Sequence, residues 1–135
     1  MTQEEAIDII RDAGFGFLAT LEGNQPHVRP MMPYLTDDGE LLLALLGRSR
    51  TIPQIKANPH VEVCYVDRKM WYCRVTGTAV ISDDISKKRI VFENMPMLRQ
   101  YFAGPEDPNY HLAVIQIKAI EAMTPHSRVP EQISL

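Results

Sequence analysis

Three closely spaced prolines, Pro26, Pro30 and Pro33, limit what this chain can fold into more than any other feature. Each proline ring fixes φ and removes a backbone N–H donor, so the stretch that holds them cannot be helical. Because a proline interrupts a hydrogen-bond ladder, such a stretch is typical of a strand at or near the edge of a sheet. The sequence therefore predicts an extended strand here, and this strand carries Arg29.

A second predicted strand ends in a basic turn. Residues 40–46 form an apolar run that is too short for an ordinary helix, which indicates a buried strand. The next four residues are Gly47-Arg48-Ser49-Arg50. Basic side chains and a hydroxyl group are therefore expected to gather just after a buried strand.

The residues after this turn have the pattern of a helix start. Thr51-Ile52-Pro53-Gln54 has the Thr-x-x-Gln form of a capping box, with a proline in the first turn. The pattern predicts a short helix to about Ala57, ended by Asn58-Pro59. Its free N–H groups would lie beside Ser49 and Arg50 and form an anion site, with phosphate as the usual biological anion of that size. The alternative is a solvated basic turn with an ordinary helix cap.

The other elements are read from periodicity and turn residues. A capping box at residues 2–5 and apolar residues at helical spacing predict a helix over residues 3–13, closed by Gly14. A helix capped by Asp83 or Asp84 is expected over residues 85–94, with a further helical turn or two over 97–102. Strands are predicted at residues 15–21, 26–35, 40–46, 61–66, 71–81 and 110–120, the last reaching as far as Met123. Residues 125–135 are polar and are expected to form a loose tail or an arm on a partner.

Six strands with a short crossover helix and helices at the ends predict an antiparallel barrel of the α+β class, mainly β. A barrel this small is filled by side chains, so a sizeable ligand must bind in an outside groove. Such grooves are commonly completed by a second subunit, and a two-fold dimer would have two equivalent sites.

Length and charge exclude several classes of protein. A chain of 135 residues suits one domain, and a net charge of −3 argues against broad nucleic-acid binding. No apolar run approaches the ~20 residues of a membrane span, and the N-terminal residues are acidic and amphipathic. We therefore expect a cytoplasmic protein that binds neither nucleic acid nor membranes.

Cysteine and histidine positions give no metal site by spacing. If the loop at residues 67–70 joins two strands, Val66 faces Trp71 and Cys64 faces Cys73, which places the two thiols side by side. They would form a bridge or, as is usual in the cytoplasm, remain reduced and packed. The histidines are dispersed surface or core residues: His27, His60, His111 and His126.

A set of short motifs occurs in a fixed order over residues 6–123: Ala19-Thr20, Gly23, Pro26–Met31, Ser49-Arg50, Gln54–Val61, the strand Trp71 to Ala79, and Asp83. This set resembles the pyridoxamine 5'-phosphate oxidase-like flavin-binding split barrels. The closest-looking branch contains the nitroimidazole-resistance-type proteins, which share the Arg-Pro strand, the Asn-Pro turn and the Trp-x-x-Arg-Val-x-Gly strand. The resemblance implies a single FMN-binding split-barrel domain over residues 1–135.

The resemblance also implies a homodimer that holds two FMN molecules in clefts between the subunits. Arg29 would hold the FMN phosphate, with Ser49 and Arg50 as further donors. The isoalloxazine would lie along backbone groups of Pro30, Met31 and Met32, flanked by Leu45, Leu46 and Gly47. Trp71 and Arg74 would come from the partner subunit.

Two departures from the family pattern limit what is carried over. The basic residue before the short helix is Arg50 where lysine is more usual, and Thr51 stands where some relatives carry that lysine. No basic residues match those with which pyridoxamine phosphate oxidases bind their substrate phosphate. Oxidation of vitamin B6 is therefore not expected.

The function that the resemblance implies is that of an FMN-dependent oxidoreductase, similar to a flavin reductase or nitroreductase. NADH or NADPH would be the donor, and a small electrophile such as a nitroaromatic or a quinone the acceptor. In such an enzyme the flavin performs the electron transfer, and the sequence indicates no catalytic side chain of its own. The alternatives are a flavin- or haem-binding protein without turnover and a reductase that uses the deazaflavin F420.

Overall fold

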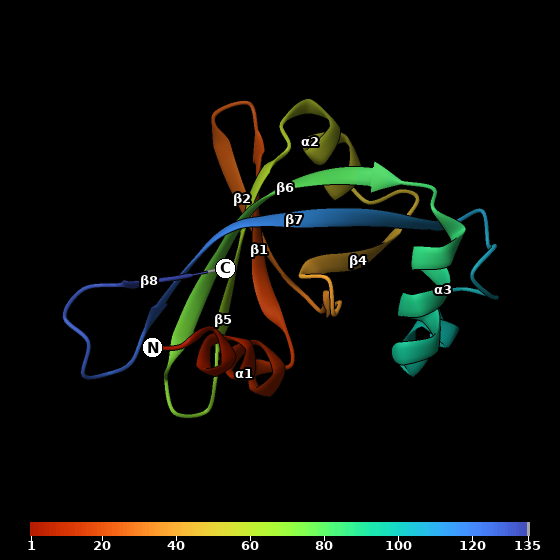
Figure 1. The fold of residues 1–135 in the computed structure, drawn as a ribbon. Coiled ribbons are helices and arrows are strands. Elements are labelled where there is room, and N and C mark those ends of the chain that lie inside the picture. The colour runs from red at the N-terminus through yellow and green to blue at the C-terminus, as the bar shows by residue number, and fades with distance from the viewer. Residues whose placement is uncertain (135) are drawn as a thin grey trace.

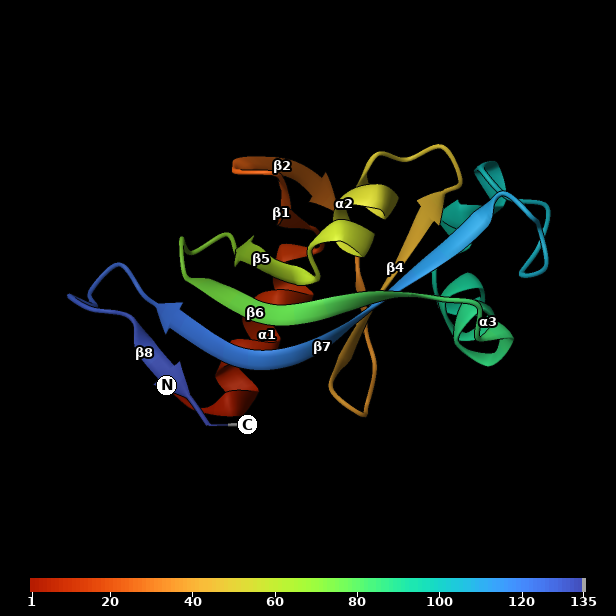
Figure 2. The ribbon, with the colours of Figure 1, turned by 90° about the horizontal axis from the view of Figure 1, so that it is seen from above.

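The computed structural model describes residues 1–134, and its largest element is one eight-stranded antiparallel sheet. The strands follow the order β2-β1-β5-β6-β7-β4-β3, and β8 pairs with β7. Their bounds are β1 Gly16–Glu22, β2 Gln25–Met31, β3 Tyr34–Leu35, β4 Glu40–Leu46, β5 His60–Val66, β6 Tyr72–Ser82, β7 Tyr110–Met123 and β8 Glu131–Ile133. The sheet is curved like a barrel (Figures 1 and 2). It is not closed, because β2 at the start of the path does not pair with β3 at its end.

Helices pack at separate places on this sheet. They are α1 Gln3–Ala13, α2 Thr51–Ala57 and α3 Ile85–Asn94, followed by the 3₁₀ helix η1 Pro96–Gln100. Helix α1 packs on β5 and β6, α2 on β1 and β6, and α3 on β4. Figure 1 shows α3 at one end of the molecule and α1 below the sheet near β5, with the long strand β7 running from the α3 end towards β8.

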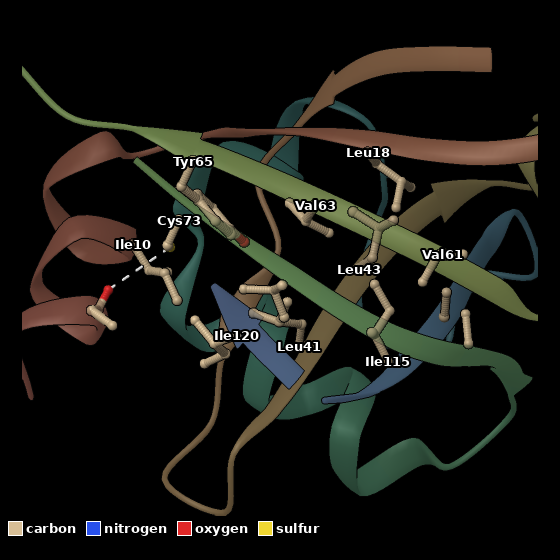
Figure 3. Close-up of a cluster of buried hydrophobic side chains, with 14 of the residues drawn as sticks. Ile10, Leu18, Leu41, Leu43, Val61, Val63, Tyr65, Cys73, Ile115 and Ile120 are labelled. Atoms are coloured by element: carbon tan, nitrogen blue, oxygen red, sulfur yellow. Dashed lines mark hydrogen bonds between the residues drawn. The ribbon is translucent and has the colours of Figure 1, made fainter. Parts of the chain in front are cut away.

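The main core lies on the inner side of the curved sheet. Leu18, Val63 and Ile115 come from three strands, are fully buried and lie together in Figure 3. Helix α1 adds Ile9 and Ile10 to this cluster from one end. Alternation of buried and exposed side chains along β1, β5 and β6 follows from the two-residue period of a strand.

Strand β4 is buried on both of its faces. Leu41 and Leu43 point into the main core, whereas Leu42 belongs to a second cluster under α3 and η1. In that second cluster the rings of Phe102 and Tyr110 stack with centroids 4.8 Å apart. Double burial explains why residues 40–46 read as an apolar run instead of an alternating one.

Most predicted elements are confirmed. The fold is a mainly antiparallel, barrel-like α+β structure with three α-helices. The Thr2 capping box is present, because Thr2 Oγ1 accepts the Glu5 N–H and Glu5 accepts the Thr2 N–H. Asp84 caps α3 by accepting from the backbone N–H groups of Ser86 and Lys87.

The structure has eight strands where the sequence predicts six. The stretch at residues 26–35 breaks at Met32-Pro33 into β2 and β3, since the chain must leave β1 there to pair with β4. The expectation of a loose tail over residues 125–135 is wrong for residues 131–133, and Leu135 lies outside the described residues. Residues 131–133 form β8 on the edge of β7, where Ile133 joins the main core.

The predicted pairing of the two cysteines is wrong by one residue. The loop between β5 and β6 ends at Trp71, so Val66 pairs with Tyr72 and Cys64 with Arg74. Asp67 fixes this longer loop by accepting the Trp71 N–H at 3.0 Å.

The two thiols therefore lie on opposite faces of the sheet, and both are free. Cys73 pairs with Tyr65 and is fully buried, with its Sγ 4.0 Å from the Ala6 carbonyl oxygen of α1 (Figure 3). Burial raises the pKa of Cys73 to about 12. Cys73 is thus a neutral packing residue of the core.

Among residues 1–134, no helix has both the length and the apolar composition needed to cross a membrane. Within the same residues, no three His, Cys, Asp or Glu side chains lie close enough to hold a metal ion.

Gly77 allows β6 and β7 to approach closely, and its replacement tests this pairing. The register of the two strands shifts between Thr76 and Gly77, where a Cβ would overlap the carbonyl oxygen of Gln116. We expect Gly77→Ala to lower the free energy of unfolding by about 1–3 kcal/mol, as overpacking does. Gly104→Ala is the control, because a Cβ there meets nothing within 4 Å. Equal urea midpoints for the two variants would contradict the described β6–β7 pairing.

Candidate functional site

A cleft of about 530 Å³ opens where the end of β4 meets η1. Its lining comes from β2, β4, the basic turn after β4, and η1 with the residues that follow it. The lining residues are Met31, Ala44, Leu45, Leu46, Arg48, Ser49, Leu98, Tyr101 and Phe102. This volume is in the range of sites for small molecules and cofactors.

The cleft has apolar walls and a basic, hydroxyl-bearing end. Leu98 and Phe102 are buried beneath it, and Tyr101 is 58% exposed on its rim. Arg48 and Ser49 are the only charged or hydroxyl side chains that the basic turn contributes to the lining. The arrangement suits a flat apolar ring system that carries an anionic group.

Arg29 lies on β2, two residues before Met31, and both side chains are therefore on the same face of the strand. Its Nη2 donates to Gln54 Oε1 at 2.9 Å and its Nη1 donates to the Leu18 carbonyl oxygen at 3.3 Å. Both acceptors are neutral. Burial lowers the pKa of Arg29, which is the effect expected for a cation taken partly out of water.

Arg29 makes no ion pair with any residue of the described chain, 1–134. A partly buried cation without a counter-ion is unfavourable, and such groups concentrate at binding sites. Arg29 is therefore a candidate for binding an anion.

Arg50 joins the same network from the other side. It is exposed, and its Nη2 lies 3.6 Å from Glu22 Oε1. Glu22 also accepts from Gln54 Nε2 at 3.3 Å. The hydrogen bond from Gln54, together with nearby Arg50, lowers the pKa of Glu22. Arg29 and Arg50 are thus linked through Gln54 and Glu22.

The predicted capping box at Thr51 is wrong, although the helix forms over Thr51–Ala57 as expected. The helix begins after Arg50, which is in the αR region and provides no side-chain cap. Gln54 does not turn back to the helix start. It is 4% exposed and bonds instead to Thr20 and Arg29, two donors that only the tertiary structure brings to it. The predicted anion site would therefore depend on side chains and not on the start of this short helix.

The structure brings some of the predicted site residues together and leaves others apart. Met31, Leu45, Leu46 and Ser49 line one cleft, and Arg29 and Arg50 share one network. The Gly47 N–H is used within the fold, since it donates to the Asn109 carbonyl oxygen at 3.0 Å. Pro30 and Met32 are exposed on or just after β2.

Trp71 and Arg74 do not line the cleft. Trp71 ends the β5–β6 loop, where the Lys69 ammonium lies 5.1 Å from its ring centroid. Arg74 lies on the outer face of β6 and pairs with Glu121 at 2.7 Å. A role at the cofactor would require them to reach the cleft of a second subunit.

Several residues of the site escaped sequence reasoning. Arg48 stands in the predicted basic turn, so the sequence pattern could have indicated its place in the cleft. Leu98 and Phe102 come from a segment about 50 residues later, and no sequence pattern indicates that they line the same cleft. The sequence pattern predicts a helix-capping role for Gln54 and gives no signal for Glu22. Their contacts to Arg29 depend on how β1, β2 and α2 pack.

The outer face of the β1–β2 hairpin is apolar. We define it by Phe15, Phe17, Val28 and Pro30. Phe17 pairs with Pro30 across the strands, and the rings of Phe15 and Phe17 lie 5.5 Å apart. Phe15, Phe17 and Val28 are 47%, 41% and 65% exposed, which is unusual for large apolar side chains gathered in one place.

Comparisons of the sequence and of the structure with known proteins identify similar proteins over nearly the whole chain. A family model described as pyridoxamine 5'-phosphate oxidase matches residues 2–124. The structure of general stress protein 26 from Bacillus anthracis str. Sterne is 32% identical, covers 98% of this chain and 97% of that chain, and superposes with a TM-score of 0.80. General stress protein 26 from Bacillus subtilis (strain 168) is 23% identical over 98% of this chain and 96% of that protein.

Other solved structures share the fold alone. A NimC/NimA family protein from Clostridium acetobutylicum is 24% identical, with a TM-score of 0.84 over 98% of this chain and 91% of that chain. Two neighbours at 16% identity are described by what they bind. One is a pyridoxamine 5'-phosphate oxidase-related, FMN-binding protein from Nostoc punctiforme (TM-score 0.73, 96% and 85% covered). The other is a haem-binding protein from Mycobacterium smegmatis (TM-score 0.79, 96% and 56% covered).

Proposed function

The chain belongs to the pyridoxamine 5'-phosphate oxidase family, and on that premise we propose that it binds FMN and acts as an oxidoreductase on a small molecule. NADH or NADPH is the proposed donor, and a small electrophile such as a quinone or nitroaromatic the acceptor. The cytoplasmic location expected from the sequence is part of this proposal.

The observation that carries the proposal is Arg29. It is a partly buried cation held by two neutral acceptors, with no counter-ion in residues 1–134. The phosphate of FMN would supply the missing negative charge. Ser49 and Arg50, which follow the buried strand β4, would add a hydroxyl and a second cation.

The cleft fits the other end of FMN. An isoalloxazine ring is flat and largely apolar, and the cleft offers an apolar wall for it. Met31 lies two residues after Arg29 on the same face of β2, and Leu45 and Leu46 lie at the end of β4. Exposed Tyr101 on the rim would cover the ring edge. Backbone groups at Pro30, Met32 and Gly47 would complete the surround.

Bound FMN would supply the electron transfer, and the chain would supply binding, orientation and exclusion of water. No carboxylate or histidine is among the residues that line the cleft. The protein would therefore act through the apolar wall and the positive charge of Arg48 at the cleft end. The same absence of an acid or base also favours the second candidate, a flavin-binding protein without turnover.

We also propose that two copies of the chain form a dimer through the outer face of the β1–β2 hairpin. A second copy is the proposed occupant because the face is apolar and self-complementary contacts are usual in two-fold dimers. Dimerisation would also explain why Trp71 and Arg74 lie outside the cleft of their own chain, since each would then serve the site of the partner.

Arg29→Ala tests the phosphate assignment. We expect the affinity for FMN to fall by more than about tenfold, because an arginine–phosphate contact contributes about 1.5–3 kcal/mol. Flavin fluorescence titration measures the dissociation constant. Arg11→Ala, on the exposed side of α1, is the control and should bind FMN as the wild type does. Unchanged FMN affinity in Arg29→Ala would show that this arginine does not hold the phosphate.

Anaerobic reduction separates the oxidoreductase from the protein without turnover. We expect NADH or NADPH to bleach the flavin absorption of the FMN-loaded protein, and a quinone or nitroaromatic to restore it. Dithionite is the control, since it reduces any accessible flavin. Bleaching by dithionite but by neither nucleotide would favour the binding-only candidate.

Val28→Glu tests the dimer. Light scattering of the wild type should give twice the 15.4 kDa of one chain. A buried, unpaired carboxylate at the centre of the outer face should dissociate it and weaken FMN binding. Val129→Glu is the control, because Val129 is 69% exposed and outside that face. A wild type whose mass by light scattering is that of one chain would rule out the proposed interface.

A further inference from the structure

Gln54 is a buried amide whose polar atoms are all engaged. Its Oε1 accepts from Thr20 Oγ1 at 2.6 Å and from Arg29 Nη2 at 2.9 Å, and its Nε2 donates to Glu22 at 3.3 Å. A flipped amide would place N–H groups against the guanidinium and an oxygen against the Glu22 carboxylate. Only one orientation of Gln54 is therefore compatible with its neighbours.

The two groups that hold the Arg29 guanidinium are both neutral. A guanidinium has five N–H donors, and Arg29 uses one on Gln54 and one on Leu18. Arg74 and Arg89, by contrast, are held by carboxylates, at 2.7 Å in Arg74–Glu121 and 3.1 Å in Arg89–Glu106. Arg29 is fixed in direction, as they are, but keeps its whole charge for a ligand.

Gln54 also separates Arg29 from the nearest carboxylate of the network. Glu22 bonds to Gln54 Nε2 and lies 3.6 Å from Arg50, while Arg29 contacts the opposite end of the same amide. The amide thus stands between the anion Glu22 and the cation Arg29. Without it, Glu22 would be free to pair with Arg29 and compete with a ligand.

We infer that Gln54 is a positioning residue that makes the site selective for a phosphate-bearing ligand. It aims Arg29 with a neutral acceptor and keeps Glu22 away from it. The inference rests on the proposed function, because it assigns the phosphate to Arg29. It adds that a neutral residue at position 54 is required for that binding.

Gln54→Glu keeps the size of the side chain, adds a negative charge and replaces the Nε2 donor to Glu22 with an oxygen. At about pH 8 the new carboxylate is ionised beside the arginine and pairs with it. Because Arg29 is then neutralised, we expect the affinity for FMN to fall at least about tenfold. The affinity for riboflavin, which lacks the phosphate, should stay within about twofold. A residue with a merely structural role would affect both flavins alike.

The measurement is a fluorescence titration of the full chain with FMN and with riboflavin, and the result is the ratio of the two dissociation constants. Gln132→Glu is the matched control, since it adds the same charge at an exposed position of β8. Apoprotein melting curves verify that each variant is folded. Thr20→Val is the second variant, because it removes one of the two donors that fix Gln54 Oε1 while keeping the side-chain shape.

The outcomes distinguish this inference from the proposed function. A wild type that binds FMN no better than riboflavin overturns both. A wild type that prefers FMN, with the same preference in Gln54→Glu, overturns the role of Gln54 alone. If Gln54→Glu does not fold, Thr20→Val decides: a several-fold loss of the FMN preference supports the inference, and an unchanged preference overturns it.

Discussion

The structure depends on one constraint: strand β4 is buried on both faces. Leu41 and Leu43 fill the barrel-like core, and Leu42 lies under α3 and η1 on the other side. A strand of this kind must be covered by a second layer, and α3 with η1 provides it. The cleft forms where this second layer stops, at the end of β4, so its position follows from the packing of the core.

The electrostatics of the site depend on the same architecture. Strands β1 and β2 and helix α2 meet at Gln54, and this meeting holds Arg29 between two neutral acceptors. A partly buried cation without a counter-ion carries a cost in free energy, and Arg29 is such a cation. Groups that are costly in the free protein and useful to a ligand are characteristic of binding sites.

The neighbours of this fold include a protein described as FMN-binding and one described as haem-binding. A shared barrel therefore does not decide the ligand, which depends on the side chains at the cleft. In this chain the cleft side chains combine an apolar wall with Ser49 and Arg48, and Arg29 lies two residues before Met31 on β2. That combination is the basis on which we propose FMN.

The sequence by itself determined most of the helices and strands and the position of the basic turn. Prolines, capping residues and apolar periodicity act over a few residues, so the helix at residues 3–13, the strand at 40–46 and the basic turn at 47–50 could all be read locally. Tertiary structure decided the rest. The β5–β6 register depends on how Asp67 closes its loop, and Gln54 meets Thr20 and Arg29 from 34 and 25 residues away. No local pattern reports such contacts, because they form only when distant segments are packed against one another.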